Sequence, residues 1–148
     1  MIQRTARCLS ALEYRELAEF RYQIRRFLHF SESAALAEGV EPRQHQALLA
    51  IKALPEGEGC AIAALARTLF LRHQSTVGLV DRLESRRLVA RRPNRKDARQ
   101  VMVALTRHGE SVLRRLSLTH RAELERNAPQ LARALRAIMR SAGSIETR

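Results

Sequence analysis

The stretch LRHQSTVGLVDRLESRRLVARRPNRKDARQVMVALT, residues 71–106, decides the fold of this chain. Apolar side chains recur through its first half at the spacing of one helix face, which predicts a helix that begins near Arg72. The buried stripe of this helix is expected to consist of Thr76, Leu79, Val80 and Leu83. Other positions of the helix must then face outward, among them Gln74, Gly78, Asp81 and Ser85.

The second half of the stretch changes from helical to strand periodicity after Leu88. The alternation sets Val101, Val103 and Leu105 against Gln100, Met102 and Ala104. This pattern predicts a strand with one buried face. Before the strand, Pro93, Asn94 and Asp97 favour a turn between two basic segments. A helix–turn–helix followed by a basic hairpin is a device that reads DNA.

Three further helices are expected before this stretch. The first begins at a capping box formed by Ser10 and Glu13 and stops at Gly39. The second covers about 42–54, with Ala47, Leu48, Ile51 and Leu54 directed inward. The third, 61–70, is rich in alanine, and its small side chains allow the close crossing that a helix–turn–helix requires.

Two helices are expected after the strand. Thr106 is a plausible N-cap, and Glu110 in the first turn suits the helix dipole. We expect this helix to extend to about Asn127. Pro129 then divides it from a last helix whose inward side chains are Leu131, Leu135, Ile138 and Met139.

The expected architecture is mostly α, of the α+β class, within a single domain over residues 1–148. Residues 42–105 form a winged helix–turn–helix lobe with a two-stranded wing. Residues 10–38 and 106–141 form a dimerisation region, because helix–turn–helix modules commonly bind DNA as two-fold dimers with half-sites about 34 Å apart.

The charge of the chain points to a polyanionic partner. Lys and Arg total 27 against 15 Asp and Glu, which gives a formal net charge of +12. Residues 72–99 contain nine basic and three acidic side chains, a balance of +6 and half of the net charge. Nucleic acid and an anionic membrane surface both attract such a chain, but the concentration of charge on one device favours DNA.

Several other classes of protein are disfavoured. There is no apolar run of the roughly 20 residues that span a bilayer and no secretory signal. Cys8 and Cys60 are too few for a disulfide scaffold and lack metal-ligand spacing, as do the five histidines. No catalytic motif is present. We therefore expect a cytoplasmic protein with reduced thiols, without a cofactor or metal, and not an enzyme.

The candidate DNA-contacting residues fall into three groups. Gln74 can pair bidentately with adenine, while Val77 can meet a thymine methyl group. The full set of base-reading candidates is Arg72, His73, Gln74, Ser75, Val77 and Gly78. Candidates for phosphate contacts are Arg82, Arg86 and Arg87, with Arg72 as a further candidate. The wing group comprises Arg91, Arg92, Arg95, Lys96, Asp97 and Arg99. For each residue alone, the alternative is a solvated surface position.

Residues 65–110 resemble the MarR family of winged-helix transcriptional regulators. The matching segments are LARTLFL (65–71), LVDRLESRRLVARR (79–92), DAR (97–99) and VMVALTRHGE (101–110). The resemblance implies a homodimeric transcription factor, usually a repressor, with its recognition helix in the major groove and its wing in the minor groove. It also implies that Asp97 braces the wing, that Arg95 or Arg99 enters the minor groove, and that a small ligand releases the DNA.

This sequence departs from the family pattern in the recognition helix. Arg72 and His73 stand where Ser-Pro is frequent, and residues 85–87, SRR, replace a turn that usually contains glycine. The DNA sequence read by other members therefore does not transfer to this chain.

Three alternatives stay open. Cys8 lies near the position of a peroxide-sensing cysteine in some relatives. The aromatics Tyr14, Phe20 and Tyr22 with His45 either line a ligand crevice or pack in a core, and core packing is preferred. A basic nucleic-acid-binding module with little sequence preference is the second hypothesis for function.

Overall fold

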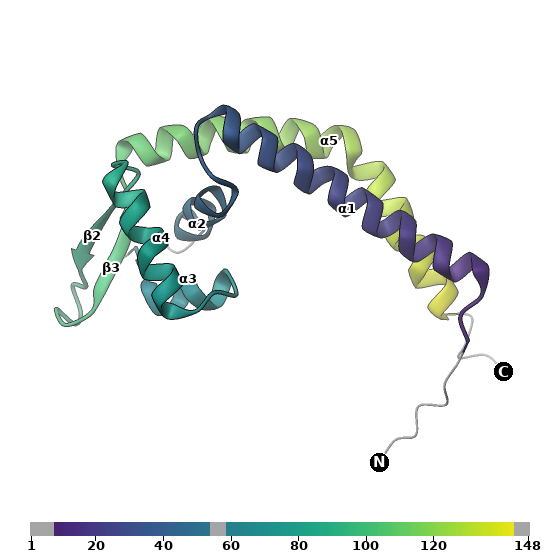
Figure 1. Cartoon of the computed structure of the whole chain (residues 1–148), viewed down its shortest axis with the longest axis horizontal. Helices are drawn as coiled ribbons and strands as arrows, with labels where there is room; N and C mark the ends of the chain where they lie inside the picture. The colour runs from purple at the N-terminus through teal and green to yellow at the C-terminus, as the bar shows by residue number, and fades with distance from the viewer. Residues whose placement is uncertain (1–7, 54–58, 144–148) are drawn as a thin grey trace, which may run out of the picture. The chain divides into compact units, whose positions relative to one another are not determined.

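The structure is a computed structural model that describes residues 8–53 and 59–143. The chain divides into two compact units: residues 31–120 form one, and residues 1–30 with 121–148 form the other. Two long helices, α1 (Ala11–Ala37) and α5 (Arg107–Gly143), contribute to both units (Figure 1). Among the described residues, no helix is long and apolar enough to cross a bilayer.

The central unit contains three short helices and a small antiparallel sheet (Figure 1). Its helices are α2 (Pro42–Lys52), α3 (Ile62–Thr68) and α4 (His73–Ser85), and its strands are β1 (Cys60–Ala61), β2 (Val89–Pro93) and β3 (Val101–Leu105). The predicted stripe of α4 is confirmed, because Thr76, Leu79, Val80 and Leu83 are all buried. The predicted inward residues Ala47, Leu48 and Ile51 of α2 are also buried, whereas Leu54 lies outside the described residues.

The hairpin of β2 and β3 confirms the predicted two-stranded wing, and β1 adds a third strand to the sheet, in the order β1-β3-β2. Cys60, expected at the start of a helix, instead pairs with Val103. A strand of two residues is too short to show any periodicity, which is why the sequence did not reveal it. Pro93 ends the edge strand β2, where its missing N–H disturbs no inner ladder.

Burial along β3 does not follow the simple alternation that was predicted. Val103 is fully buried, but Val101 is 45% exposed and Met102 is buried. The third strand explains the difference, because β1 pairs with Met102 and Val103 only. Val101 has a neighbour on one side alone, opposite Pro93, and therefore stays open to solvent.

The predicted capping box at the start of α1 is confirmed. The Ser10 N–H donates to the Glu13 carboxylate at 2.8 Å, and the Glu13 N–H donates to Ser10 Oγ at 3.3 Å. The predicted end of the helix is confirmed as well, since α1 stops at Ala37 and Gly39 has a φ of 70°.

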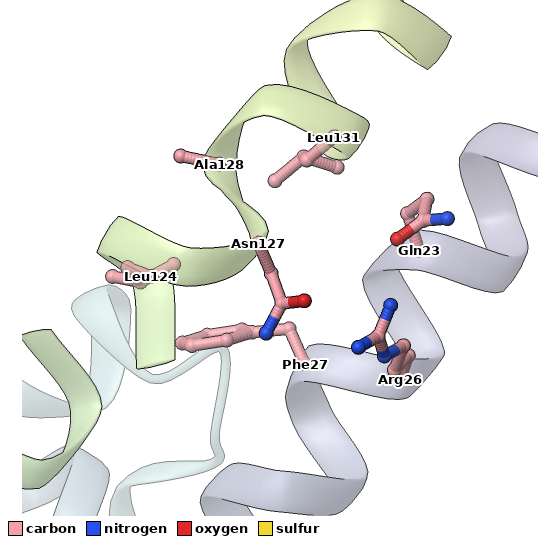
Figure 2. A pocket seen from close by; sticks show the side chains of 7 residues that line it. All are labelled: Gln23, Arg26, Phe27, Leu124, Asn127, Ala128 and Leu131. Atoms are coloured by element: carbon pink, nitrogen blue, oxygen red, sulfur yellow. The ribbon is translucent and has the colours of Figure 1, made fainter. Parts of the chain in front are cut away.

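The expectation of two separate helices after Thr106 was wrong, because α5 is continuous and carries Pro129 in its interior. A proline removes one helical hydrogen bond and can bend a helix without ending it. Two residues before this proline, the Asn127 side-chain amide donates to the Glu123 carbonyl at 3.2 Å. Further along α5, Ser141 donates a hydrogen bond to Glu16 of α1. The unit formed by residues 1–30 and 121–148 also contains a small pocket between α1 and α5, lined in part by Phe27 and Leu131 (Figure 2).

Candidate nucleic-acid interface

The N-terminal turn of α4 presents most of the base-reading candidates. His73, Gln74 and Ser75 are exposed, whereas Val77 and Gly78 are half-buried. Arg72 is also exposed and occupies the N-cap in an extended conformation, without supplying a side-chain cap. The first N–H groups of a helix carry a partial positive charge that attracts phosphate oxygens. The opposite face of α4 is buried, so this turn is held on a fixed element.

The turn that precedes α4 is strained. Phe70 has a φ of 53° and its side chain is 96% exposed. Bulky residues rarely adopt this left-handed conformation, which favours glycine. The expected helix 61–70 is shorter for this reason, because α3 ends at Thr68 and the chain turns through Phe70. The sequence did not predict this turn, since phenylalanine is not among the residues that favour turns.

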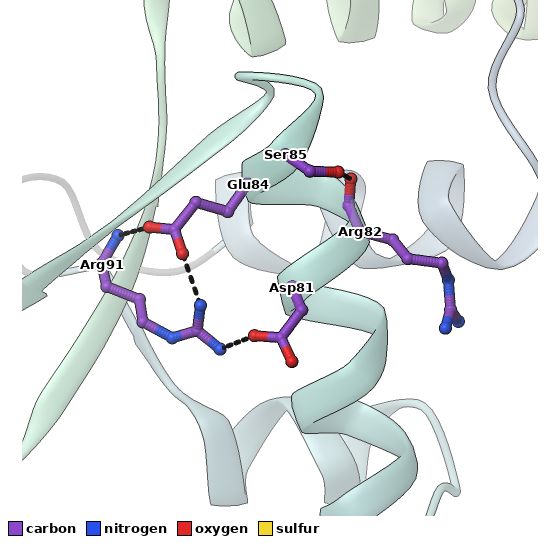
Figure 3. Close-up of polar contacts among 5 residues, drawn as sticks. All are labelled: Asp81, Arg82, Glu84, Ser85 and Arg91. Atoms are coloured by element: carbon purple, nitrogen blue, oxygen red, sulfur yellow. Dashed lines mark hydrogen bonds and ion pairs between the residues drawn. The ribbon is translucent and has the colours of Figure 1, made fainter.

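Arg91, at the base of the wing, is engaged by two acids of α4 (Figure 3). Its Nη1 donates to Glu84 at 2.5 Å, and its Nη2 donates to Asp81 at 2.5 Å. Its backbone N–H also donates to Glu84 at 3.0 Å. The hydrogen bond from this N–H is the main reason that the pKa of Glu84 is lowered, and Asp81 is the main reason that the pKa of Arg91 is raised. Sequence reasoning grouped Arg91 with the DNA-contacting wing cations and missed this cluster.

The three phosphate candidates near the end of α4 differ in their surroundings. Arg82 is exposed and extends away from the Arg91 cluster in Figure 3. Arg86 donates from Nη1 to Gln44 of α2 at 2.9 Å, so part of its guanidinium is occupied. Arg87 is exposed and has a φ of 57°, a left-handed conformation that favours glycine, within the SRR turn of residues 85–87.

Asn94 and Asp97 organise the tip of the wing. The Asn94 carbonyl side-chain oxygen accepts the Lys96 N–H at 2.9 Å, and Asp97 Oδ1 accepts the Arg99 N–H at 3.0 Å. Each of these hydrogen bonds closes a local turn of the kind that asparagine and aspartate side chains favour, as predicted. Asp97 thus supports the tip through the backbone of Arg99. Three arginine side chains of the wing group are exposed around this turn: Arg92, Arg95 and Arg99.

Thr106 and Gly109 join the wing to α5. Thr106 Oγ1 accepts the Gly109 N–H at 3.0 Å, which confirms the predicted N-cap. The same hydroxyl donates to the Arg87 carbonyl at 2.5 Å. A Cβ on Gly109 would collide with the Leu88 carbonyl oxygen. The spacing of Thr106 and Gly109 in the VMVALTRHGE segment therefore reflects a close contact between the start of α5 and the turn after α4.

Two histidines pack together in the core of the central unit. The rings of His45 in α2 and His120 in α5 have centroids 4.6 Å apart. His120 Nδ1 lies 2.6 Å from the Leu116 carbonyl, and Nε2 lies 2.7 Å from Ser31 Oγ. Since a carbonyl only accepts, Nδ1 is the donor to Leu116. Burial is the main cause of the lowered pKa of His45, and repulsion by His120 adds to it.

The remaining candidates lie in different settings. Tyr14 and Tyr22 are exposed. Cys8 is exposed and Cys60 is buried. Burial raises the pKa of the Cys60 thiol, which disfavours the reactive thiolate. Within the described residues, no group of three His, Cys, Asp or Glu side chains is placed to hold a metal ion.

A crossed helix pair, an outward-facing recognition helix and a basic hairpin define the winged helix–turn–helix class of DNA-binding proteins. Residues 38–100 match the model of the MarR family. Over this segment the chain is similar to that family of transcriptional regulators.

Comparisons with individual proteins agree with this similarity. The chain is 33% identical over 92 residues to the transcriptional activatory protein BadR of Rhodopseudomonas palustris, a match that covers 62% of this chain and 53% of the relative. It thus spans about half the length of that curated protein.

Two solved structures share the fold. CouR from Rhodococcus jostii RHA1, bound to p-coumaroyl-CoA, is 24% identical, with 83% of this chain and 87% of that chain covered and a TM-score of 0.64. A mutant of MepR from S. aureus, bound to an oligodeoxyribonucleotide, is 17% identical, with 84% and 90% covered and a TM-score of 0.63.

Proposed function

We propose that the chain regulates transcription by binding a specific DNA sequence, with α4 in the major groove and the β2–β3 wing in the adjacent minor groove. The observation that carries this proposal is that the central unit presents two outward-facing elements, the first turn of α4 and the tip of the wing. The first turn of α4 presents Gln74 beside exposed polar neighbours, and the ordered wing tip presents Arg95 and Arg99. Gln74 is the leading base reader, and either wing arginine is suited to a narrow minor groove.

The active form is proposed to be a homodimer. The long helices expose many large apolar side chains: Leu12, Tyr14, Leu17, Tyr22, Leu28 and Leu36 of α1, and Leu118, Leu124, Leu135 and Met139 of α5. Extended apolar surfaces of this kind favour association, and a two-fold dimer presents two recognition helices to one face of the duplex. Sedimentation analysis is expected to give twice the chain mass at micromolar concentration.

Selection from a random-sequence duplex pool tests the DNA proposal directly. Repeated binding, amplification and sequencing with the wild-type protein is expected to yield an inverted repeat whose half-sites are about one helical turn apart. The same sequence should be protected in a footprint of the DNA that flanks the gene. Equal affinity for the selected duplex and a scrambled duplex would instead support a basic module with little sequence preference.

We propose repression as the direction of control, because a dimer that covers a promoter excludes polymerase from it. BadR is by name an activator, so transcription in vitro from a promoter that carries the selected site distinguishes the two directions. A fall in transcript as protein is added supports repression, and a rise supports activation.

A small-molecule effector that weakens DNA binding is also proposed. The ligand-bound structure of CouR suggests an aromatic acyl-CoA thioester as the first probe. Titration of p-coumaroyl-CoA into the complex with the selected duplex, followed by fluorescence polarisation, should release the DNA. Coenzyme A and p-coumarate, added separately, are the controls for each half of the probe. Retention of the DNA at saturating thioester would exclude this class of effector.

A further inference from the structure

Arg91 joins the recognition helix to the wing through three hydrogen bonds (Figure 3). Two of them come from the guanidinium, and the third comes from the backbone N–H of β2 itself. The acceptors Asp81 and Glu84 are three residues apart on α4, so they occupy one face of the helix. The contact therefore connects the backbone of a strand, and not only a flexible side chain, to the helix.

We propose that Arg91 is a positioning residue for DNA recognition, which fixes the wing relative to α4, and that Asp81 and Glu84 are its partners in this role. The proposal rests on the DNA-binding function proposed above. It assigns to two carboxylates a part in binding a polyanion, and it removes Arg91 from the group of direct DNA contacts.

The geometry distinguishes this cluster from an ordinary surface ion pair. An isolated exposed pair contributes little because both side chains remain mobile and hydrated. The Arg91 side chain, however, is only 28% exposed, and its two nitrogens engage different carboxylates. Glu84 uses one oxygen for the guanidinium and the other for the N–H, which fixes its orientation as well. Since β2 is an edge strand, this contact also occupies a donor on its open side.

The side chains of Arg82 and Arg91 differ in their surroundings. Arg82 follows Asp81 in the sequence, yet its side chain extends away from the cluster in Figure 3. Arg82 is thus available for phosphate, whereas the charge of Arg91 is offset by the two acids. A direct phosphate contact by Arg91 would require the guanidinium to leave both carboxylates.

The two roles predict opposite effects of Asp81→Asn. If Arg91 contacts phosphate, loss of a nearby negative charge raises affinity for every duplex. If Arg91 positions the wing, the same change weakens the brace and lowers affinity for the selected duplex, by about tenfold, with little change for the scrambled duplex. The matched control is Glu110→Gln. This variant also removes one negative charge from the central unit, but at an ion pair with Lys52 that does not involve α4. A gain in affinity for both duplexes with Asp81→Asn would overturn the proposal.

A double-mutant cycle tests the connection between the partners. Arg91→Ala is expected to lower the ratio of specific to scrambled affinity about as much as Asp81→Asn, and the double variant should add little because both changes break one contact. Arg91→Lys keeps the charge but cannot span both carboxylates, so it should recover affinity for the scrambled duplex without restoring the ratio. Additive losses, or full restoration by lysine, would contradict the positioning role.

Amide hydrogen exchange provides a measurement without DNA. In Arg91→Lys, amides of β2 and β3 should exchange faster than in the wild type, while those of α2 stay unchanged. Unaltered exchange in both strands would overturn the proposal even if DNA binding changed. If the wild-type protein selects no sequence, the proposed function fails, and hydrogen exchange still decides whether Arg91 holds the wing.

Discussion

The carbonyl oxygen of Leu88 lies so close to Gly109 that a Cβ atom on this glycine would be 1.9 Å from it. The turn after α4 and the first turn of α5 thus meet backbone to backbone. Thr106 strengthens the junction, because its hydroxyl bonds the Arg87 carbonyl and also caps α5.

Gly109→Ala is expected to destabilise the protein by about 2–4 kcal/mol, because either the helix or the turn must move. Urea denaturation followed by circular dichroism measures the change. Gly78→Ala is the control, since its Cβ would lie 3.7 Å from the flexible end of the Arg82 side chain, and alanine is the better helix former. The control should gain up to about 1 kcal/mol. Equal stability of the two variants would contradict the close approach at Gly109.

Gly78→Ala separates stability from DNA binding. If the edge of the major groove approaches the α4 backbone at Gly78, the added methyl group should lower affinity for the selected duplex about tenfold while the protein becomes more stable. Fluorescence polarisation gives the affinity. Ser85→Ala, at the far end of α4, is the comparison and should leave the affinity unchanged. Undiminished binding by Gly78→Ala would remove this residue from the interface.

Arg87→Gly should stabilise the fold and weaken DNA binding together. Relief of the left-handed conformation is expected to add about 1 kcal/mol to the free energy of unfolding. Loss of one phosphate contact should reduce the slope of log affinity against log salt by about 1. Phe70→Gly relieves a similar strain without a change of charge, so it should gain stability with an unaltered slope. Identical salt slopes for all three proteins would exclude Arg87 as a phosphate contact.

Acidification should destabilise the central unit through His45. Its pKa is lowered in the folded state, so the unfolded chain takes up the proton first as pH falls. The free energy of unfolding is therefore fully retained above about pH 6.5, the ordinary histidine pKa, and decreases as pH falls through the lower folded value. Urea denaturation across this range should show a shallower dependence in His45→Gln than in the wild type. Equal pH dependence of the two proteins would contradict this role of His45.

Wing arginines should contribute most of the specific affinity that the tip supplies. Arg95→Ala or Arg99→Ala is expected to remove most of the binding to the selected duplex and to lower the salt slope by about 1. Arg121→Ala, which removes an exposed arginine of α5 outside the central unit, is the matched control for charge. A loss no larger than that of the control would show that the wing is a solvated surface.

Local patterns in the sequence predicted the parts of the fold that local chemistry controls. The α4 stripe follows from helical spacing, the start of α1 from Ser10 and Glu13, and the wing turn from Asn94 and Asp97. Each depends on residues a few positions apart, which determine the backbone whatever packs on it.

The features that the sequence did not predict depend on contacts between residues distant in sequence, or on other interactions that offset a local loss of stability. Strand β1 forms because β3 offers an edge to Cys60, and Met102 is buried as a consequence. Pro129 ends no helix, since the rest of α5 outweighs one lost hydrogen bond. For Arg91, the charge run showed many cations but could not show that this one turns back to α4. The roles assigned to individual DNA-contacting residues remain predictions.

The choice of arginine over lysine on the DNA-binding lobe has a chemical consequence. The chain contains only two lysines, Lys52 and Lys96, among its 27 basic residues. Lysine amines are the targets of acetylation, whereas the guanidinium group keeps its proton at any physiological pH. Acylating metabolites can therefore neutralise very few of the positive charges that the lobe presents to DNA. Within the wing, Lys96 is the only residue with a side-chain amine.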